Sequence, residues 1–382
     1  MATRRPRNAR AARPVRGVGA EASGQIASAR AQIDAVDEQL HALINERARL
    51  ARQVGISKHR DGHLVDFYRP EREAEVLRRA KDRNHGPLRD EEVLRLFREI
   101  MSACLAQEEP LKVAFLGPEG TFTQTAVFTQ FGHSVRALPL PSVDEVFHEV
   151  EAGNVDFGVV AIENSTEGMV INTLDRFLTS PVKICGEVEL HIHHYLLGRM
   201  HTLGDIERVC SHQQALAQCR GWLDEHLPQA ERVAVASNAE GARRARDEKG
   251  SAAIAGESAA EVYGLDVLAS EIEDHADNTT RFFVLGRKLL ARSGKDRTTL
   301  LVSVGHTDAP GALFRLLEPL AKHRVSMTRI ESRPSRRRKW DYVFFIDIEG
   351  HVEDTHVARA IAALEKRASL FRVLGSYPRA VT

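Results

Sequence analysis

The stretch ARAQIDAVDEQLHALINERARLARQVGISK, residues 29–58, carries apolar residues that recur with a period near 3.5. This period predicts one long helix from about residue 26 to residue 58. Such a helix would extend about 48 Å, which exceeds the width of a small domain. Two short neighbouring helices cannot cover so long a stripe, so we expect a partner chain to cover the rest. The stripe consists of Ile33, Leu40, Ile44, Ala51 and Val54.

Four charged residues, Arg30, Asp37, Arg47 and Lys58, occupy the same repeating positions as the apolar stripe. A charge that faces a helical core must be paired or solvated, because unpaired burial costs several kcal/mol. Three cations against one carboxylate leave positive charge that a bound anion could neutralise. The alternative is a hydrated helix interface in which the long side chains reach water, and periodicity alone leaves both interpretations open.

Spacing along the helix separates two of these cations. Arg30 and Arg47 are 17 positions apart, which corresponds to about 25 Å along a helix axis. They cannot both contact one small ligand from the same straight helix. In an antiparallel dimer, Arg30 of one protomer can reach Arg47 and Lys58 of its partner. The sequence therefore predicts sites shared between two subunits.

The segments on either side complete a helical domain. The first twenty residues contain six arginines and no acidic residue, so we expect a disordered basic tail over residues 1–22. After the long helix, Pro70 and the Gly86–Pro87 pair predict two shorter helices, from Glu71 to about residue 83 and from Asp90 to about residue 107. The domain would extend over residues 23–109.

The sequence pattern changes at Pro110. From there, short apolar runs such as LKVAFL, VDFGVVAI and TRFFVL alternate with helical stretches. This alternation predicts an α/β domain over residues 111–286 with mostly buried strands. A charged linker covers residues 287–297. The remaining segment, residues 298–376, has the order βαββαβ of a ferredoxin-like α+β domain. Its expected elements are strands 299–305, 325–333, 341–349 and 370–376 and helices 310–322 and 353–367.

Four motifs place polar groups at strand ends in the α/β domain: GPEGTF (117–122), IENSTEG (162–168), SHQQALAQ (211–218) and DNTTRF (277–282). Loops at the carboxyl ends of strands are where α/β folds bind ligands. Taken one at a time, GPEGTF is better explained as a plain turn between strand and helix, and IENSTEG leaves function and turn chemistry evenly balanced. DNTTRF sets a hydroxyl beside a guanidinium, which suits a carboxylated substrate that must lose hydroxide.

The segment 29–58, followed by RPEREAEVL at 69–77, resembles the all-helical chorismate mutases. The resemblance implies that arginines hold the two substrate carboxylates, since the guanidinium fork suits them. Lys58 would donate to the ether oxygen as its bond breaks, and Glu73 would fix the ring hydroxyl. The implied residues are Arg30 of the partner chain, Arg47, Lys58, Arg72 and Glu73.

Two positions depart from the mutase pattern. Arg69 stands where one form of the pattern has an acidic residue. Glu108 stands where the family often has a glutamine as second donor to the ether oxygen. A carboxyl group donates only when protonated, so this catalytic role requires a raised pKa at Glu108.

The combination of GPEGTF, IENSTEG and TTRF resembles the prephenate dehydratases across residues 111–286. The resemblance implies two α/β lobes, as in periplasmic binding proteins, with the substrate between them. Thr280 would be the proton donor to the departing ring hydroxyl. Prephenate already stores the energy of aromatisation, so we expect no metal and no cofactor. The family usually has SHPQ where this chain has SHQQ. The residues implied to line the site are Glu163, Asn164, Ser211, Gln218 and Arg281.

The C-terminal segment contains GALFRLL from Gly311 and ESRPS from Glu331, and it resembles an ACT domain of the phenylalanine-binding kind. Such domains pair across subunits. From the residues alone, ESRPS is equally a polar turn. The implied effector residues are Gly311, Ala312, Leu313, Glu331, Ser332, Arg333 and Pro334.

Together the three resemblances point to the bifunctional P-proteins, enzymes of phenylalanine biosynthesis. The expected reactions are rearrangement of chorismate to prephenate and dehydration of prephenate to phenylpyruvate, with feedback inhibition by L-phenylalanine, in a homodimer or higher homo-oligomer. The 53 basic and 53 acidic residues balance, so we expect no nucleic acid and no membrane as partner. Four cysteines without CxxC spacing favour reduced thiols in the cytoplasm.

Two other functions fit part of the sequence. An amino-acid sensor, with a binding cleft fused to an ACT domain, would explain the last two domains but neither the TTRF motif nor the cations in the helical stripe. A dehydratase whose helical domain serves only for dimerisation is favoured by Arg69 and Glu108. An assay of chorismate consumption distinguishes these two functions from the bifunctional enzyme. HIHH (191–194) lacks a third metal ligand, so we expect no metal there.

Overall fold

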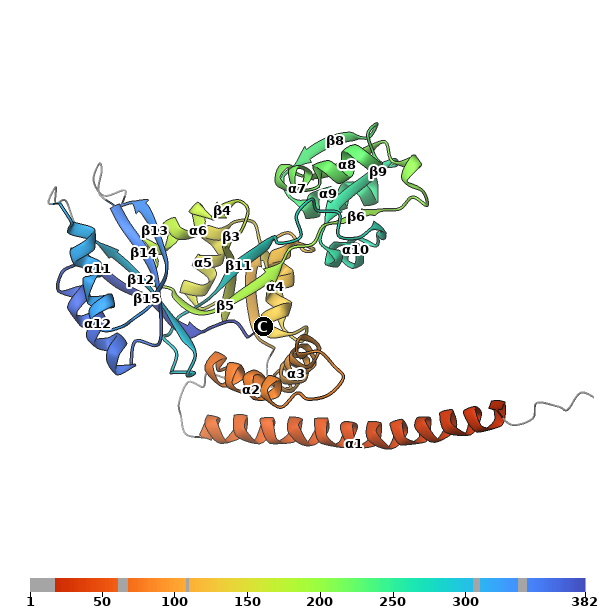
Figure 1. Ribbon diagram of the computed structural model, residues 1–382, viewed down its shortest axis with the longest axis horizontal. Helices are drawn as coiled ribbons and strands as arrows, with labels where there is room; N and C mark the ends of the chain where they lie inside the picture. Colours follow the sequence, from red (N-terminus) through yellow and green to blue (C-terminus); the bar gives the residue numbers. More distant parts are fainter. Residues whose placement is uncertain (1–17, 61–67, 108–109, 305–309, 336–341, 382) are drawn as a thin grey trace, which may run out of the picture.

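The computed structural model describes residues 18–60, 68–107, 110–304, 310–335 and 342–381, with the backbone alone at 18–24 and 55–60. Figure 1 shows a helical domain, a two-lobed α/β region and a C-terminal domain. The expected fold class, a multidomain chain with all-α, α/β and ferredoxin-like parts, is confirmed. Among the described residues, no helix combines the length and the apolar character needed to cross a membrane.

Three helices form the N-terminal domain: α1 (Val18–Arg60), α2 (Pro70–Asp82) and α3 (Asp90–Leu105). Helix α1 begins at Val18, within the stretch that the sequence suggested would be a disordered tail, and residues 1–17 lie outside the described part. Proline occupies the first position of α2, where its missing N–H is not needed. Ala74 and Leu77 of α2 and Leu94 of α3 are buried.

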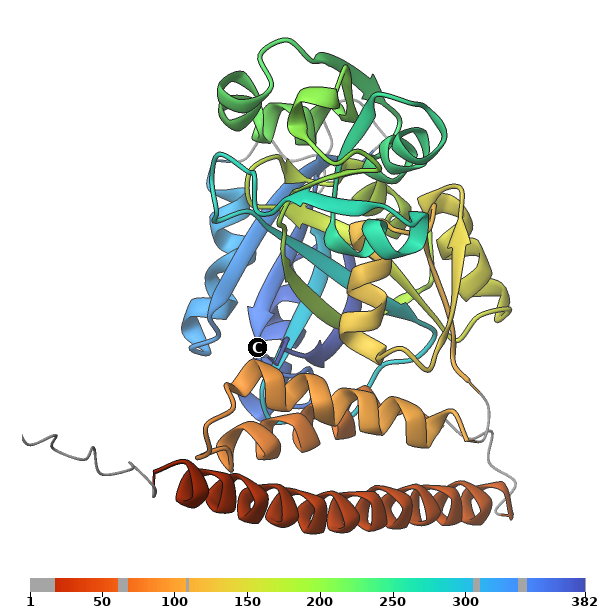
Figure 2. The same cartoon turned by 90° about the vertical axis from the view of Figure 1, so that its right-hand side faces the viewer.

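Helix α1 runs as a single rod beneath α2 and α3 (Figure 2). Its apolar side chains stay largely uncovered: Ile33, Leu40 and Leu43 are 58%, 51% and 66% exposed. Exposing an apolar stripe of this length to water is unfavourable. Because α1 is one continuous helix over Val18–Arg60, the sequence-based prediction of one long helix is confirmed.

The first α/β lobe combines a mixed sheet with three helices. Strands β1 and β2 pair in parallel, as do β1 and β3, while β11 runs antiparallel between β3 and β5. Its elements are β1 (Lys112–Leu116), α4 (Phe122–Phe131), β2 (Arg136–Leu140), α5 (Val143–Ala152), β3 (Phe157–Asn164), β4 (Gly168–Met169), α6 (Ile171–Phe177), β5 (Lys183–His191) and β11 (Thr279–Gly286).

The second lobe is a separate five-stranded sheet in the order β10-β6-β9-β7-β8. The chain enters it through residues 192–194 and leaves it through residues 270–278, and Figure 1 shows it projecting from the first lobe. Its elements are β6 (Tyr195–Gly198), the 3-10 helix Leu203–Asp205, β7 (Arg208–His212), α7 (Gln213–Gln218), α8 (Arg220–His226), β8 (Glu231–Val235), α9 (Asn238–Asp247), β9 (Ser251–Ala255), α10 (Glu257–Tyr263) and β10 (Asp266–Ala269).

The C-terminal domain has the expected βαββαβ order, with sheet order β13-β14-β12-β15 and β13 at the free edge. Its core contains Leu300, Leu316, Ile346 and Leu364, from two strands and both helices. Its elements are β12 (Asp296–Ser303), α11 (Ala312–Lys322), β13 (Met327–Pro334), β14 (Tyr342–Glu349), α12 (Thr355–Glu365) and β15 (Leu370–Pro378).

The sheets of the C-terminal domain and the first lobe join edge to edge where β15 meets β5 in parallel, with Gly375 opposite Ile184. A side chain at Gly375 would come within 2.2 Å of the Ile184 carbonyl oxygen, so only glycine allows this approach. The junction places strands of the two domains in one sheet of ten strands.

Candidate active sites

A cluster of polar side chains, Thr280, Asn164, Asn278 and Gln218, connects the two lobes. Thr280 on β11 lies opposite Asn164 on β3, and Asn164 Nδ2 donates to Thr280 Oγ1 at 2.8 Å. Since the Thr280 oxygen accepts this bond, its own hydrogen remains available for donation. Thr280 and Asn164 are buried, and buried hydroxyl and amide groups interact more strongly than they would in water.

The remaining two members carry the cluster across to the second lobe. Asn164 Nδ2 also donates to Asn278 Oδ1 at 2.8 Å, and Asn278 Nδ2 donates to Gln218 Oε1 at 3.1 Å. Gln218 ends α7 in the second lobe, whereas Asn278 lies in the return crossover. Three residues expected to line the dehydratase site, Thr280, Asn164 and Gln218, are thus connected through a fourth that the sequence did not indicate.

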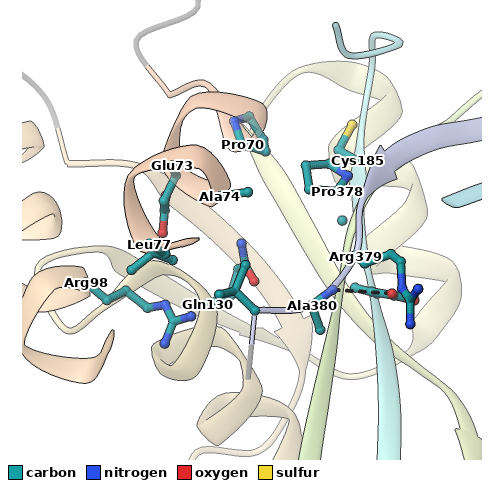
Figure 3. Close-up of a pocket in the computed structure, with 13 residues that line it drawn as sticks. Pro70, Glu73, Ala74, Leu77, Arg98, Gln130, Cys185, Pro378, Arg379 and Ala380 are labelled. Atoms are coloured by element: carbon teal, nitrogen blue, oxygen red, sulfur yellow. Dashed lines mark hydrogen bonds between the residues drawn. The ribbon is translucent and has the colours of Figure 1, made fainter. Parts of the chain in front are cut away.

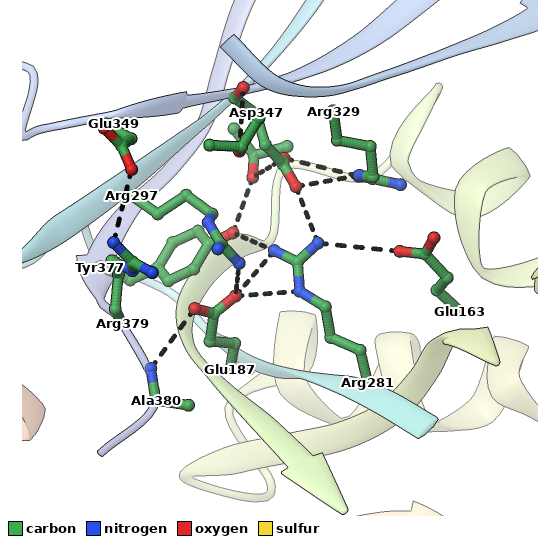
Figure 4. Close-up of polar contacts among 12 residues, drawn as sticks. Glu163, Glu187, Arg281, Arg297, Arg329, Asp347, Glu349, Tyr377, Arg379 and Ala380 are labelled. Atoms are coloured by element: carbon green, nitrogen blue, oxygen red, sulfur yellow. Dashed lines mark hydrogen bonds and ion pairs between the residues drawn. The ribbon is translucent and has the colours of Figure 1, made fainter. Parts of the chain in front are cut away.

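Arg281 and Glu163 lie on the other side of the sheet, because successive strand residues point to opposite faces. The Arg281 guanidinium donates to Glu187 at 2.9 Å, Asp347 at 2.8 Å and the Tyr377 hydroxyl at 3.2 Å (Figure 4). The Glu163 carboxylate lies 4.0 Å from it. The expectation that the hydroxyl and guanidinium of TTRF act side by side is therefore not met, since the guanidinium is turned toward the C-terminal domain.

Asp347 is the central acceptor of this network. It is fully buried and accepts from Arg281, Arg329 and the Thr299 hydroxyl at 2.8, 2.9 and 2.7 Å. Burial alone would raise the pKa of Asp347, but the Arg329 and Arg281 guanidinium groups outweigh it and hold the pKa at about 2. A carboxylate with two guanidinium partners therefore sits between β11 and β13.

The Ser211 hydroxyl makes its hydrogen bonds to residues of the second lobe. It is fully buried at the end of β7, where its hydroxyl donates to the Ile254 carbonyl at 2.6 Å and lies 3.0 Å from Asn238 Oδ1. Gln213 begins α7 directly after the His212 N-cap. Because the single hydroxyl hydrogen is already used within the second lobe, Ser211 supports β7 and β9 in this arrangement.

In the helical domain, Glu73 faces a pocket between α2, α3, α4 and the residues after β15 (Figure 3). Arg98, Gln130 and Arg379 line the same pocket. Burial raises the pKa of the Glu73 carboxyl to about 7, against a hydrogen bond from Tyr68 and the charges of Arg98 and Arg47. The charge of Arg47 on α1 thus acts on the Glu73 carboxyl on α2.

The raised pKa of Glu73 has a consequence for stability. A carboxyl group that binds its proton more tightly when folded stabilises the protein fully below its unfolded value of 4.5, and this stabilisation is lost as pH rises toward 7. We expect Glu73→Gln, which stays neutral, to unfold at a higher temperature than the parent at pH 8 and at nearly the same temperature near pH 4, below the unfolded pKa of 4.5. Thermal unfolding at both pH values tests this.

Glu75 offers a matched control for that experiment on the same helix. Arg72 and Arg79 pair with its carboxylate, and these partners lower the pKa of Glu75. The variant Glu75→Gln should therefore gain no stability at pH 8. A gain in both variants alike, or in neither, would contradict the assignment of a partly buried, weakly ionised Glu73.

The other expected mutase residues are described only in part. Arg30 is exposed on α1, and Arg72 pairs with Glu75 at the surface. The side chain of Lys58 and the whole of Glu108 lie outside the described residues. A complete site with Arg30 cannot form on one straight helix, because Arg30 and Arg47 are about 25 Å apart along the helix axis.

The expected effector residues lie at the outer side of the C-terminal domain. Gly311 caps α11 with φ +76°, and Ala312 and Leu313 begin that helix. Glu331, Ser332, Arg333 and Pro334 belong to β13. Arg333 forms an ion pair at 3.3 Å with Asp175 of α6, so this strand also contacts the first lobe.

The histidines of HIHH have protein partners. His191 Nδ1 lies 3.2 Å from the Thr279 hydroxyl, and His193 Nδ1 lies 2.7 Å from Glu273. Within the described ranges, no three histidine, cysteine or acidic side chains are grouped so as to hold a metal ion.

Family comparisons agree with this order of domains. The chain matches the models for chorismate mutase type II over residues 29–109, prephenate dehydratase over 113–289 and the ACT domain over 300–366. It is 52% identical to a bifunctional chorismate mutase/prephenate dehydratase of Pseudomonas aeruginosa, over 94% of this chain and 98% of the relative. A relative of the same description from Aquifex aeolicus is 43% identical over 92% and 97%.

Among solved structures, the prephenate dehydratase of Arthrobacter aurescens in complex with L-Phe is 39% identical, with a TM-score of 0.66 over 71% of this chain and 90% of that one. Fold and domain order define a multidomain enzyme with a mutase, a dehydratase and an ACT domain. More closely, the chain belongs to the bifunctional chorismate mutase/prephenate dehydratase family, and it has both activities.

Proposed function

We propose that the dehydratase reaction takes place at the Thr280 cluster, with Thr280 as proton donor. The observation that carries this is the direction of the Asn164–Thr280 hydrogen bond, which leaves the Thr280 hydrogen free. Donation to the ring hydroxyl of prephenate lets water depart while the ring carboxylate leaves as carbon dioxide and its electron pair completes the aromatic ring. The Asn164 N–H stabilises the charge that grows on the Thr280 oxygen.

For the mutase reaction, we infer a homodimer whose two sites each take residues from both subunits. The exposed stripe of α1 supports this, since its length suits a second copy of the same helix running antiparallel. Arg30 of one protomer would join Arg47, Arg72 and Lys58 of its partner around the two carboxylates of chorismate. Lys58 and a protonated Glu108 would donate to the ether oxygen, with Glu73 at the ring hydroxyl.

The C-terminal domain offers a second surface for the same dimer. Strand β13 has an unpaired edge in the sheet of the described residues. Its Ile330 is 39% exposed, and Phe314 of α11 is 72% exposed. An exposed edge with apolar neighbours favours pairing with another chain. We therefore place the ACT domains of two subunits edge to edge, in a homodimer or a larger assembly built from it.

We further propose that L-phenylalanine binds at the ACT domain and lowers dehydratase activity. The solved relative in complex with L-Phe supports this ligand. Two contacts support the coupling: Arg333 of the ESRPS strand pairs with Asp175, and Arg329 of the same strand shares Asp347 with Arg281. Arg281 directly follows Thr280, so a shift of β13 acts on the strand that carries the proton donor.

We expect Glu331→Ala to weaken inhibition by phenylalanine while the dehydratase rate without phenylalanine stays near that of the parent. Coupling energies between sites are typically 1–3 kcal/mol, so the inhibitory concentration should rise about 5–150-fold. Phenylpyruvate formation from prephenate, titrated with phenylalanine, measures it. Glu353→Ala, an exposed carboxylate of the same domain, is the control, and equal inhibition of both variants would contradict the proposed effector site.

We also infer a reducing compartment, such as the cytoplasm, for this enzyme. All four cysteines are described, and each is a buried, reduced thiol. Desolvation raises the pKa of the Cys219 thiol above the usual range, which keeps it in the unreactive protonated form.

A further inference from the structure

His194 is a buried histidine in the first crossover between the lobes, where β5 passes into β6. It is only 2% exposed. Its backbone N–H donates to Glu273 at 2.8 Å, and its ring packs edge-on against Phe122 of α4, with 5.7 Å between centroids. The ring is therefore fixed from both the first lobe and the second crossover.

The hydrogen-bond directions around His194 follow from the backbone of the IENSTEG loop. The N–H groups of Thr166 and Glu167 both donate to Asn164 Oδ1, at 3.0 and 3.1 Å. The other end of the Asn164 amide must then be its NH2 group, which donates to Asn278 Oδ1 as well as to Thr280. This fixes the orientation of Asn278 in turn.

The same reasoning continues to His194. With its oxygen occupied by Asn164, Asn278 donates through Nδ2 to Gln218 Oε1. Gln218 Oε1 also lies 2.8 Å from His194 Nε2, and two groups that meet at one oxygen must both be donors. His194 therefore carries its proton on Nε2. Burial lowers the pKa of the ring, which keeps the other nitrogen unprotonated.

Two polar atoms at the end of this series of hydrogen bonds have no partner within the described residues. The NH2 group of Gln218 and Nδ1 of His194 are both buried and have no hydrogen-bond partner among the described residues. Unpaired buried polar atoms cost free energy, and a ligand, an ion or a water molecule can complete their bonding. A glutamine NH2 group in a site for a dicarboxylate substrate is suited to donate to a carboxylate oxygen.

We propose that His194 and Asn278 are positioning residues of the dehydratase site, which hold the Gln218 carbonyl from two sides so that its NH2 group is presented to prephenate. The inference rests on the proposed roles of Gln218 and Thr280. The chain of hydrogen bonds passes from the first lobe through both crossovers to the second lobe. Gln218 and Thr280 therefore reach their positions for catalysis together, at one particular distance between the two lobes.

A double-mutant cycle on prephenate dehydration tests whether His194 acts through Gln218. The variants are His194→Leu, Gln218→Ala and the double replacement. We expect each single variant to lower kcat/KM about 10–100-fold, as loss of positioning does, and the double variant to be no worse than the more impaired single one. Independent, multiplying losses would overturn the proposal. An unimpaired Gln218→Ala would instead overturn the role of Gln218 itself.

A conservative variant separates hydrogen bonding from packing. His194→Gln keeps an N–H donor near the position of Nε2, and it should recover kcat/KM to within about tenfold of the parent. His193→Gln, a change on the neighbouring, half-exposed histidine, should leave the rate unchanged. Mutase activity on chorismate should equal that of the parent in every variant. A His194→Gln enzyme as impaired as His194→Leu would show that packing alone matters and would overturn the proposal.

Discussion

Replacing Thr280 with alanine is expected to lower phenylpyruvate formation about 10²–10⁴-fold, the usual contribution of a positioned general acid. The methyl group cannot donate a proton, and Asn164 would lose its hydroxyl acceptor. Chorismate should still be converted to prephenate, because the helical domain contributes the mutase residues. Product analysis from chorismate should therefore show accumulated prephenate in place of phenylpyruvate.

Two variants sharpen this experiment. Thr280→Ser keeps the hydroxyl and should retain much of the activity. Thr279→Ala removes the neighbouring hydroxyl, which faces the other way and contacts His191, and it should behave like the parent. If Thr280→Ala dehydrated prephenate at the parental rate, the proton donor would have to be another group. If it lost both activities, the change would have disrupted folding.

The helices and the C-terminal domain could be predicted from sequence because local signals determine them. Pro70 marks the beginning of α2, and the period of the apolar stripe follows directly from the helical repeat. In the C-terminal domain each predicted strand and helix overlaps the observed one, since turn residues and apolar runs alternate clearly. Local patterns of this kind need no knowledge of distant contacts.

The direction in which the Arg281 side chain points could not be predicted from the sequence in the same way. The motif TTRF places it beside Thr280 in sequence, but strand geometry separates their side chains. Its partner Asp347 is 66 positions away and belongs to another domain. A sequence alone does not show which face of β11 the C-terminal domain covers, because that depends on how β15 joins β5.

The hydrogen-bond chain through His194 and Asn278 was also beyond the sequence. A histidine beside a strand is ordinarily interpreted as a packing residue. The hydrogen-bond partner of His194, Gln218, lies 24 positions further along the chain. Asn278 stands within DNTTRF, two residues before Thr280, and the period of two in a strand could have placed both on one face. The sequence does not show that the backbone N–H of Thr166 donates to Asn164 Oδ1, and this bond is what orients the Asn164 amide.

The largest stability effect is expected from Asp347→Ala. This change removes the shared partner of Arg281 and Arg329, whose side chains are 11% and 12% exposed. Removing one member of a buried ion pair leaves an uncompensated charge and costs about 3–5 kcal/mol. Calorimetry should show a lower unfolding temperature. Because β11 carries both Arg281 and Thr280, the dehydratase rate should fall in the same variant although Asp347 lies outside the Thr280 cluster.

Glu349→Ala is the matched control, two residues further along β14. Its carboxylate pairs with Arg379 at 3.4 Å, and both side chains are about half exposed. Solvent-exposed pairs contribute about 0–1 kcal/mol, so the unfolding temperature should barely change. Equal effects at both positions would mean that the domains are held together by the β15–β5 junction and apolar packing. In that case Arg281 would not link the ACT domain to the strand of the proton donor, and regulation would have to pass through Arg333 and Asp175.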